Sequence, residues 1–151
     1  MIVAVFITSV TLLAAAPNDA VVVSFWAVQA THEGQNPKHF DPGLEAIQGA
    51  VADLPFDTYR KVQAAEKKLA FGSENRLALD ARYTLVLKPI AKEPDGRIRM
   101  DIRVEMAPQN PQDKPVTALS TRMALSPGKQ TKLGGFKLDR GELVIVLSAR
   151  S

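Results

Sequence analysis

The chain has 151 residues, of which 46% are hydrophobic and 23% are charged, and 19 basic against 16 acidic side chains give a net charge of +3. These values are close to those of folded proteins, so they exclude a wholly disordered chain, a collagen-like repeat and a polytopic membrane protein. The chain has no cysteine, which excludes disulfide bonds, thiolate nucleophiles, iron–sulfur clusters and cysteine-ligated zinc. So small a positive excess is not typical of a nucleic-acid-binding protein, and we expect no nucleic-acid partner.

The N-terminus has the pattern of an export signal. The first 30 residues contain no lysine or arginine, and residues 2–16 are an unbroken apolar or hydroxyl-bearing run that includes Ala14 and Ala16. This run has the length of a signal-peptide core and is too short for a membrane-spanning helix of about 20 residues. We therefore predict a signal peptide over residues 1–16, with later cleavage at Ala20 or Ala30 as alternatives. A buried first strand or helix, or a misassigned start codon, would also explain the run.

The predicted mature chain is a single β-rich domain over residues 20–151, periplasmic or secreted, without an integral membrane span. Residues 20–30 (AVVVSFWAVQA) are β-branched and aromatic, which predicts a buried central strand containing Trp26, the single tryptophan of the chain. The polar residues 31–40 predict a loop. Asp41 and Pro42 are typical of the cap and first position of a helix, and apolar residues recur at helical spacing up to Pro55. This pattern predicts one short amphipathic helix near residues 43–53.

After Thr58 the apolar residues recur with a period of two, which is typical of strands. The alternation from Leu77 to Leu87 predicts one long strand, and the turn signal Pro94-Asp95-Gly96 precedes a second, over residues 97–106, with the cleanest alternation in the chain. Further strands are predicted over residues 116–125, 132–138 and 142–149. Several strands separated by turn signals predict a mainly β fold, either an antiparallel β-sandwich or a small barrel.

One cluster, His32, Glu33, His39 and Asp41, has residue types that bind metal ions. Its spacing matches no helical zinc motif, because a zincin places two histidines four residues apart on one helix face. The favoured interpretation is that these are solvated or capping side chains of a loop, and we expect no metal site. The alternative is a small metal-dependent hydrolase that uses His32 and His39.

Other catalytic patterns are missing from the sequence. There is no G-x-S-x-G motif, and Gly134-Gly135 lacks the spacing and the lysine of a phosphate-binding loop. In a strand such a glycine pair indicates a bulge or a bend. We therefore expect a protein that is not an enzyme and that needs no cofactor.

The strand over residues 97–106 carries arginines on its polar face, interrupted by Asp101 and Glu105. We expect a solvated face whose charges neutralise one another; an anionic surface or nucleic acid is the alternative ligand of this face. Three exposed segments are candidate protein contacts: the 31–40 loop, the 108–115 loop and this strand face. The residues predicted to contribute are Arg97, Arg99, Arg103, His39, Gln109 and Asn110.

Two resemblances point to a bacterial envelope protein. The order of Ala30-Thr31-His32-Glu33-Gly34, then Asp41-Pro42-Gly43-Leu44, then residues 54–60 (LPFDTYR) resembles small uncharacterised exported proteins of predatory and gliding bacteria, which implies a β-rich fold and no known activity. Residues 85–106 and 121–136 resemble the strand pattern of secretins, the outer-membrane pores of secretion and pilus machines. The chain has no room for the repeated domains and long hairpins of a secretin.

These resemblances imply a periplasmic partner or small module of such a machine. From them and from the exposed segments we expect a non-catalytic binding or structural domain of the bacterial envelope, which contacts an envelope protein, a secretion or pilus component among the candidates. Addition of a partner strand to a sheet edge is the contact mode expected of a small sheet protein.

Overall fold

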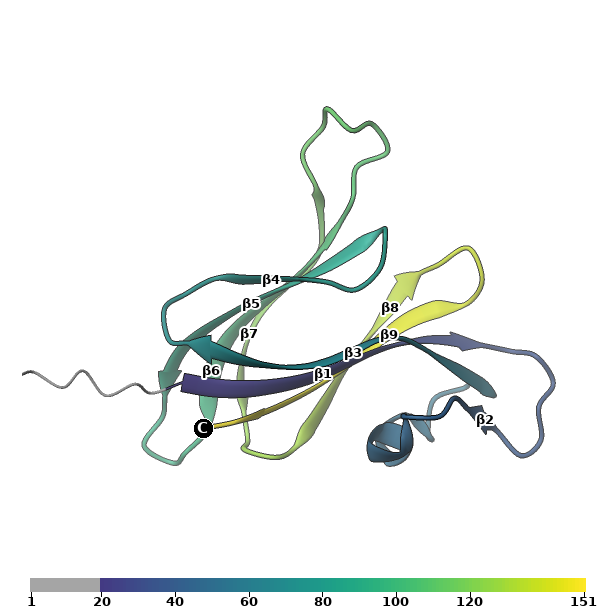
Figure 1. The fold of residues 1–151 in the computed structure, drawn as a ribbon, viewed down its shortest axis with the longest axis horizontal. Helices are drawn as coiled ribbons and strands as arrows, with labels where there is room; N and C mark the ends of the chain where they lie inside the picture. Colours follow the sequence, from purple (N-terminus) through teal and green to yellow (C-terminus); the bar gives the residue numbers. More distant parts are fainter. Residues whose placement is uncertain (1–19) are drawn as a thin grey trace, which may run out of the picture.

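The computed structural model describes residues 20–151, which form two β-sheets packed face to face (Figure 1). One sheet has five strands in the order β2-β3-β1-β9-β8, and the other has four in the order β4-β5-β6-β7. All neighbouring strands are antiparallel except β2 and β3. The strands are β1 (Ala20–Thr31), β2 (His39–Phe40), β3 (Thr58–Ala70), β4 (Asn75–Ala78), β5 (Tyr83–Lys92), β6 (Ile98–Met106), β7 (Val116–Leu125), β8 (Gln130–Lys137) and β9 (Glu142–Arg150). The predicted β-sandwich is confirmed; the sheets do not close into the alternative barrel.

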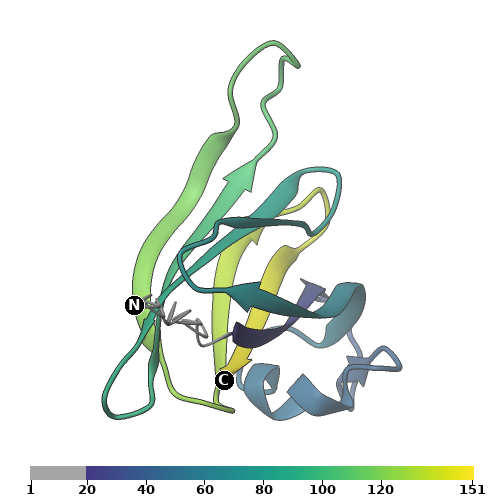
Figure 2. The same ribbon diagram turned by 60° about the vertical axis from the view of Figure 1, so that its left-hand side comes forward.

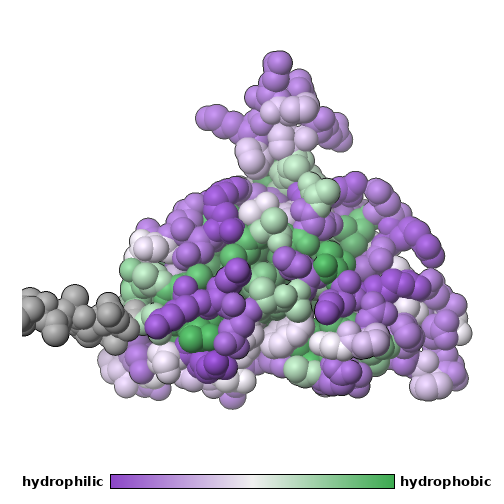
Figure 3. Space-filling model, viewed as in Figure 1, coloured by the Kyte–Doolittle hydropathy of each residue, from purple (hydrophilic) through white to green (hydrophobic). Residues whose placement is uncertain are grey.

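The main core lies between the two sheets and follows the predicted alternation. In β6, the apolar residues Ile98, Met100, Ile102 and Val104 are fully buried, and they pack with the inward face of β1, β5 and β9. Partly buried apolar side chains extend this core to the side of the sandwich where β3 and β4 lie, seen as hydrophobic spheres among hydrophilic ones in Figure 3. Strand β1 lies between β3 and β9, as predicted for a central strand.

A second, smaller core covers the outer face of the five-stranded sheet. A 3₁₀ turn, η1 (Glu45–Ile47), continues into a single helical turn, α1 (Gln48–Val51), and this segment lies against the sheet at one end of the molecule (Figure 2). The hydroxyl of buried Tyr59 donates a hydrogen bond to the carbonyl of Val51 (2.9 Å). Among residues 20–151, the five-stranded sheet is therefore covered on both faces, whereas the four-stranded sheet packs on one face only.

The predicted helix exists, but its predicted start is wrong. The helical segment begins at Glu45, after Leu44, and no side chain caps it. The Asp41 carboxylate instead accepts a hydrogen bond from the backbone N–H of Lys61 (3.0 Å), because β2 pairs with β3 at this point. The pairing holds Asp41 at the sheet, away from the helix.

The predicted long strand from Leu77 to Leu87 is also wrong, because it is divided into β4 and β5. The carboxylate of Asp80 accepts hydrogen bonds from the backbone N–H groups of Arg82 (2.8 Å) and Tyr83 (2.7 Å). This side-chain turn reverses the chain in the middle of the alternating pattern.

The predicted signal peptide over residues 1–16 lies outside the described residues. Among residues 20–151, no helix is both long and apolar enough to cross a membrane.

Candidate functional site

The six residues predicted to bind a partner do not form one site. Arg97 precedes β6 at one end, and Gln109 and Asn110 follow it at the other, so the nine residues of that strand, about 30 Å, lie between them. His39 belongs to β2, in the other sheet. The structure therefore divides these residues among three separate places.

The arginines of β6 and of the turn before it are engaged in ion pairs with carboxylates of β6 and of the connections beside β4 and β6. Bound in this way, they offer little free positive charge to an anionic ligand, and pairs as exposed as these contribute little to stability. The pairs are Arg97–Asp95 (2.7 Å), Arg99–Glu93 (3.1 Å), Arg103–Glu105 (3.0 Å) and Arg103–Glu74 (3.2 Å).

The outer face of the four-stranded sheet has a shallow depression of about 620 Å³ over β5, β6 and β7. Its floor carries the cross-strand row Lys88, Asp101 and Arg122, in which a carboxylate lies between two cations. Arg122 lowers the pKa of Asp101 below its ordinary value, chiefly through their hydrogen bonds. The charges of this face alternate in sign, as the sequence predicts.

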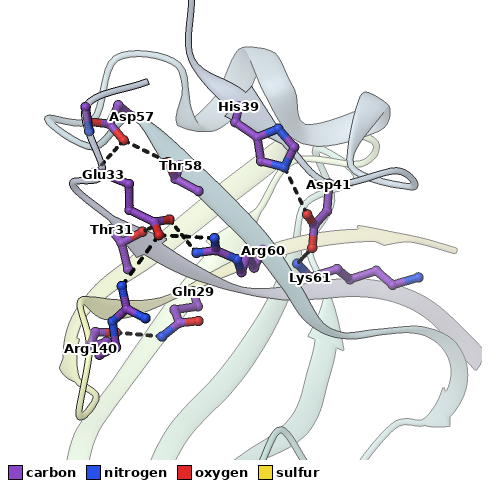
Figure 4. Close-up of polar contacts among 11 residues, drawn as sticks. Gln29, Thr31, Glu33, His39, Asp41, Asp57, Thr58, Arg60, Lys61 and Arg140 are labelled. Carbon is purple, nitrogen blue, oxygen red and sulfur yellow. Dashed lines mark hydrogen bonds and ion pairs between the residues drawn. The ribbon is translucent and has the colours of Figure 1, made fainter. Parts of the chain in front are cut away.

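A second polar cluster joins the 31–40 loop to β3 and to the turn before β9 (Figure 4). The Glu33 carboxylate accepts hydrogen bonds from both terminal nitrogens of Arg60, from the Thr31 hydroxyl (2.9 Å) and from Arg140 (3.5 Å). The hydrogen bonds from Arg60, followed by that from Thr31, hold the pKa of Glu33 below its ordinary value. This carboxylate is thus ionised and fully engaged within the protein.

Asp57 completes the cluster from the start of β3. Its carboxylate accepts hydrogen bonds from the backbone N–H groups of Glu33 (2.8 Å) and Gly34 (3.0 Å) and from the Thr58 hydroxyl (2.8 Å). The hydrogen bond from the Glu33 N–H is the main cause of the lowered pKa of Asp57. The two carboxylates thus fasten the 31–40 loop to β3.

The two histidines make different contacts. The His39 ring nitrogen Nε2 lies 3.2 Å from the Asp41 carboxylate, whereas the His32 ring packs against Phe56 with its centroid 5.0 Å away. Within residues 20–151, no group of three His, Asp or Glu side chains is placed to hold a metal ion. No contact in the described part of the chain favours the metal-dependent hydrolase.

The sheet edges differ in how well they are protected against an added strand. A long exposed edge invites pairing with another chain unless charges, bulges or shortness prevent it. Strand β3 pairs with β2 only at Thr58 and Tyr59, but its remaining length carries Lys61, Glu66, Lys67 and Lys68. Strand β4 has only four residues. Strand β8 is interrupted by the predicted bulge at the glycine pair.

Strand β7 is a long edge with little charge, and its one bulge, at Ala118, leaves residues 119–125 in regular pairing with β6. It has ten residues (VTALSTRMAL) with a single charge, Arg122, and among residues 20–151 it pairs with one strand, β6. Its residue Val116 is 52% exposed and is the one large hydrophobic side chain in the described part of the chain that is exposed. Leu119 and Met123, partly buried, lie against the main core. Strand β7 is therefore the candidate functional site.

No protein-family model matches the chain, and no curated protein or solved structure matches it.

The apolar alternation over residues 116–125 predicts β7 with the correct bounds but does not show that it is an edge. The available signal was its low charge: one residue in ten of β7 is charged, compared with five in ten of residues 97–106. Only the sheet order shows that no described strand covers its outer side.

Proposed function

We propose that this chain is a non-catalytic binding domain of the bacterial envelope that takes an extended segment of a partner protein at the free edge of β7. One observation carries the proposal: β7 combines ten residues, a single charge and a side that no strand among residues 20–151 covers, and beyond its one bulge, at Ala118, residues 119–125 pair regularly with β6. By contrast, β4 is short, β3 is highly charged, and β8 is bulged and carries two lysines in eight residues.

Strand addition uses groups that an edge strand already presents. Alternate residues of β7 direct their backbone N–H and C=O groups away from β6, where an added strand would bond to them. On the core side, the side chains of Leu119 and Met123 would pack against apolar side chains of the added strand. On the other side, Ser120 and Ala124 are exposed and small, so they leave room for a partner's side chains.

The location rests on the N-terminal pattern. Residues 1–16 resemble a signal peptide; cleavage there would leave β1 intact as the central strand, and cleavage after Ala20 would remove only its first residue. Export would place the domain in the periplasm or outside the cell. A component of a secretion or pilus machine is the partner class that the secretin-like strand pattern supports.

Site-directed photocrosslinking tests the edge. A photoreactive residue replaces exposed Ala118 of β7 or, as the control, exposed Ala70 of the β3 edge, in the full chain expressed in its native cells. We expect an adduct with an envelope protein from position 118 and none from position 70. Equal adducts from both positions, or a chain that stays uncleaved in the cytosol, would contradict the proposal.

A variant with two added carboxylates on β7 provides a second test of this edge. In Ser120→Glu/Ala124→Glu, both new carboxylates lie opposite arginines of β6, Arg103 and Arg99, which limits repulsion within the sheet and should preserve folding. Because these arginines already pair with Glu105, Glu74 and Glu93, the two added carboxylates leave the edge with a net negative charge. This variant should lose the adduct formed from position 118. The matched control, Gln63→Glu/Ala70→Glu, adds the same charge to exposed positions of β3 and should keep the adduct.

A further inference from the structure

A groove on the outer face of the five-stranded sheet is independent of β7 and has no role in the function proposed above. It has a volume of about 340 Å³ and lies between the segment after α1 and the strands β8 and β9. Its walls include Leu54, Pro55 and Phe56, its floor includes Val144 and Gly134, and Lys132 and Glu142 line it as well. This size is at the lower end of small-molecule sites, which are roughly 300 to 1,000 Å³.

The walls of the groove are held in place by two lysines. The ammonium of Lys38 donates hydrogen bonds to the carbonyls of Ala52 and Leu54 (2.8 Å each), and the ammonium of Lys132 lies 2.6 Å from the Asp53 carboxylate. The groove is therefore formed before any ligand arrives, which reduces the entropy lost on binding.

Of the two glycines in β8, backbone geometry requires only Gly135. Gly135 has a φ of +91°, which a bulge with a left-handed residue requires. Gly134 does not have a positive φ, and a Cβ at this position would meet only a methyl group of Val144 at 3.9 Å, an ordinary contact. Neither backbone strain nor crowding requires glycine there, although glycine weakens a strand.

The charged side chains that line the groove indicate which charge its ligand should carry. Lys132 is neutralised by Asp53, whereas Glu142 makes no ion pair among residues 20–151, even though Lys137 lies opposite it in the β8–β9 register. An apolar groove with one available carboxylate suits an apolar body that carries a cation. We propose that this groove binds a small organic amine with an aromatic or aliphatic body, and that Gly134 keeps its floor open for that body.

The test uses phenethylamine as the probe, with phenethyl alcohol and 3-phenylpropionate as uncharged and anionic counterparts. Backbone amide shifts of the ¹⁵N-labelled chain are followed by NMR. Phenethylamine should give saturable shifts at Phe56, Gly134 and Val144, with a dissociation constant on the order of 1 mM. The two counterparts should bind at least fivefold more weakly. Equal binding of all three probes, or shifts elsewhere only, would overturn the proposal.

Two variants examine the floor and the charge separately. Gly134→Val should abolish the saturable shifts while leaving the melting temperature unchanged or higher, and Thr117→Val, on exposed β7, should bind as the parent chain does. Glu142→Gln should weaken phenethylamine at least fivefold and leave phenethyl alcohol unchanged; if Gly134→Val fails to fold, this result decides. Unchanged binding in Glu142→Gln would overturn the proposal, and so would tighter binding of an acetylated and amidated Lys-Phe dipeptide, which would indicate a peptide ligand.

Discussion

Arg122 of β7 makes a two-point ion pair with Asp101 of β6, with Nε–Oδ1 at 2.6 Å and Nη2–Oδ2 at 3.0 Å. Two parallel hydrogen bonds of this kind hold the guanidinium in one orientation. Because Arg122 is the one charged residue of β7, its engagement with β6 leaves the outer side of the edge without a charge that would repel an added strand.

The assignment of faces in β6 predicts unequal effects of two neighbouring alanine substitutions. Ile102 is fully buried, so Ile102→Ala should lower the free energy of unfolding by about 2 to 4 kcal/mol through lost burial and the cavity left behind. Arg99 is half-exposed and paired only with Glu93, so Arg99→Ala should cost less than about 0.5 kcal/mol. Urea unfolding of the two variants measures the difference, and equal losses would refute the assigned faces.

The turn before β9 predicts a glycine that cannot be replaced. A Cβ on Gly141 would lie 2.1 Å from the carbonyl oxygen of Ala30, and its φ is +73°. Gly128 has a similar φ of +75°, but nothing lies within 4 Å of its Cβ position. Gly128→Ala should therefore cost only the backbone strain, about 1 to 2 kcal/mol, and Gly141→Ala should cost clearly more. Thermal unfolding compares them, and a Gly141→Ala variant as stable as Gly128→Ala would contradict the close approach.

The Glu33 cluster predicts a loss of stability in acid. Because the pKa of Glu33 is held below its ordinary value of 4.5 by Arg60, the unfolded chain binds more protons than the folded one as the pH falls through this region. The stabilisation is complete above the unfolded-state pKa and is lost as the pH falls through the folded-state pKa.

Urea unfolding between pH 3 and pH 7 checks this sign. Glu33→Gln should flatten the dependence of unfolding free energy on pH at the acid end, and Arg60→Gln should flatten it too, since it removes the first cause of the low pKa. An acid slope unchanged in both variants would show that Glu33 does not contribute to it.

Local patterns in the sequence predicted the strands well where one face is buried. The alternation in residues 97–106 predicts both the strand and its buried face, because a shift of one residue would turn every apolar side chain to water. The same rule predicted one strand over Leu77 to Leu87 where there are two. The apolar side chains of β4 and β5 lie on one face of the hairpin, so their alternation continues across the turn at Asp80 that reverses the chain.

Long-range pairing is the part that the sequence could not supply. Asp41 looks like a helix cap in its local context. However, β2 pairs with β3, some twenty residues further along the chain, and the Asp41 carboxylate therefore accepts a hydrogen bond from the backbone N–H of Lys61. The candidate site also depends on long-range pairing, because the order of all strands in the sheet decides whether another strand covers β7. The groove likewise combines residues 54–56 with residues of β8 and β9, a contact that no local pattern specifies.

Amide hydrogen exchange of the mature chain, alone and in complex with the envelope partner captured by crosslinking, tests the central claim most directly. Strand addition should slow exchange in residues 116–125 on binding and leave residues 60–70 of the β3 edge unchanged, because only the outward N–H groups of β7 gain partners. Protection that appears at β3 or at the helical segment, with residues 116–125 unchanged, would contradict the assignment of β7 as the binding edge.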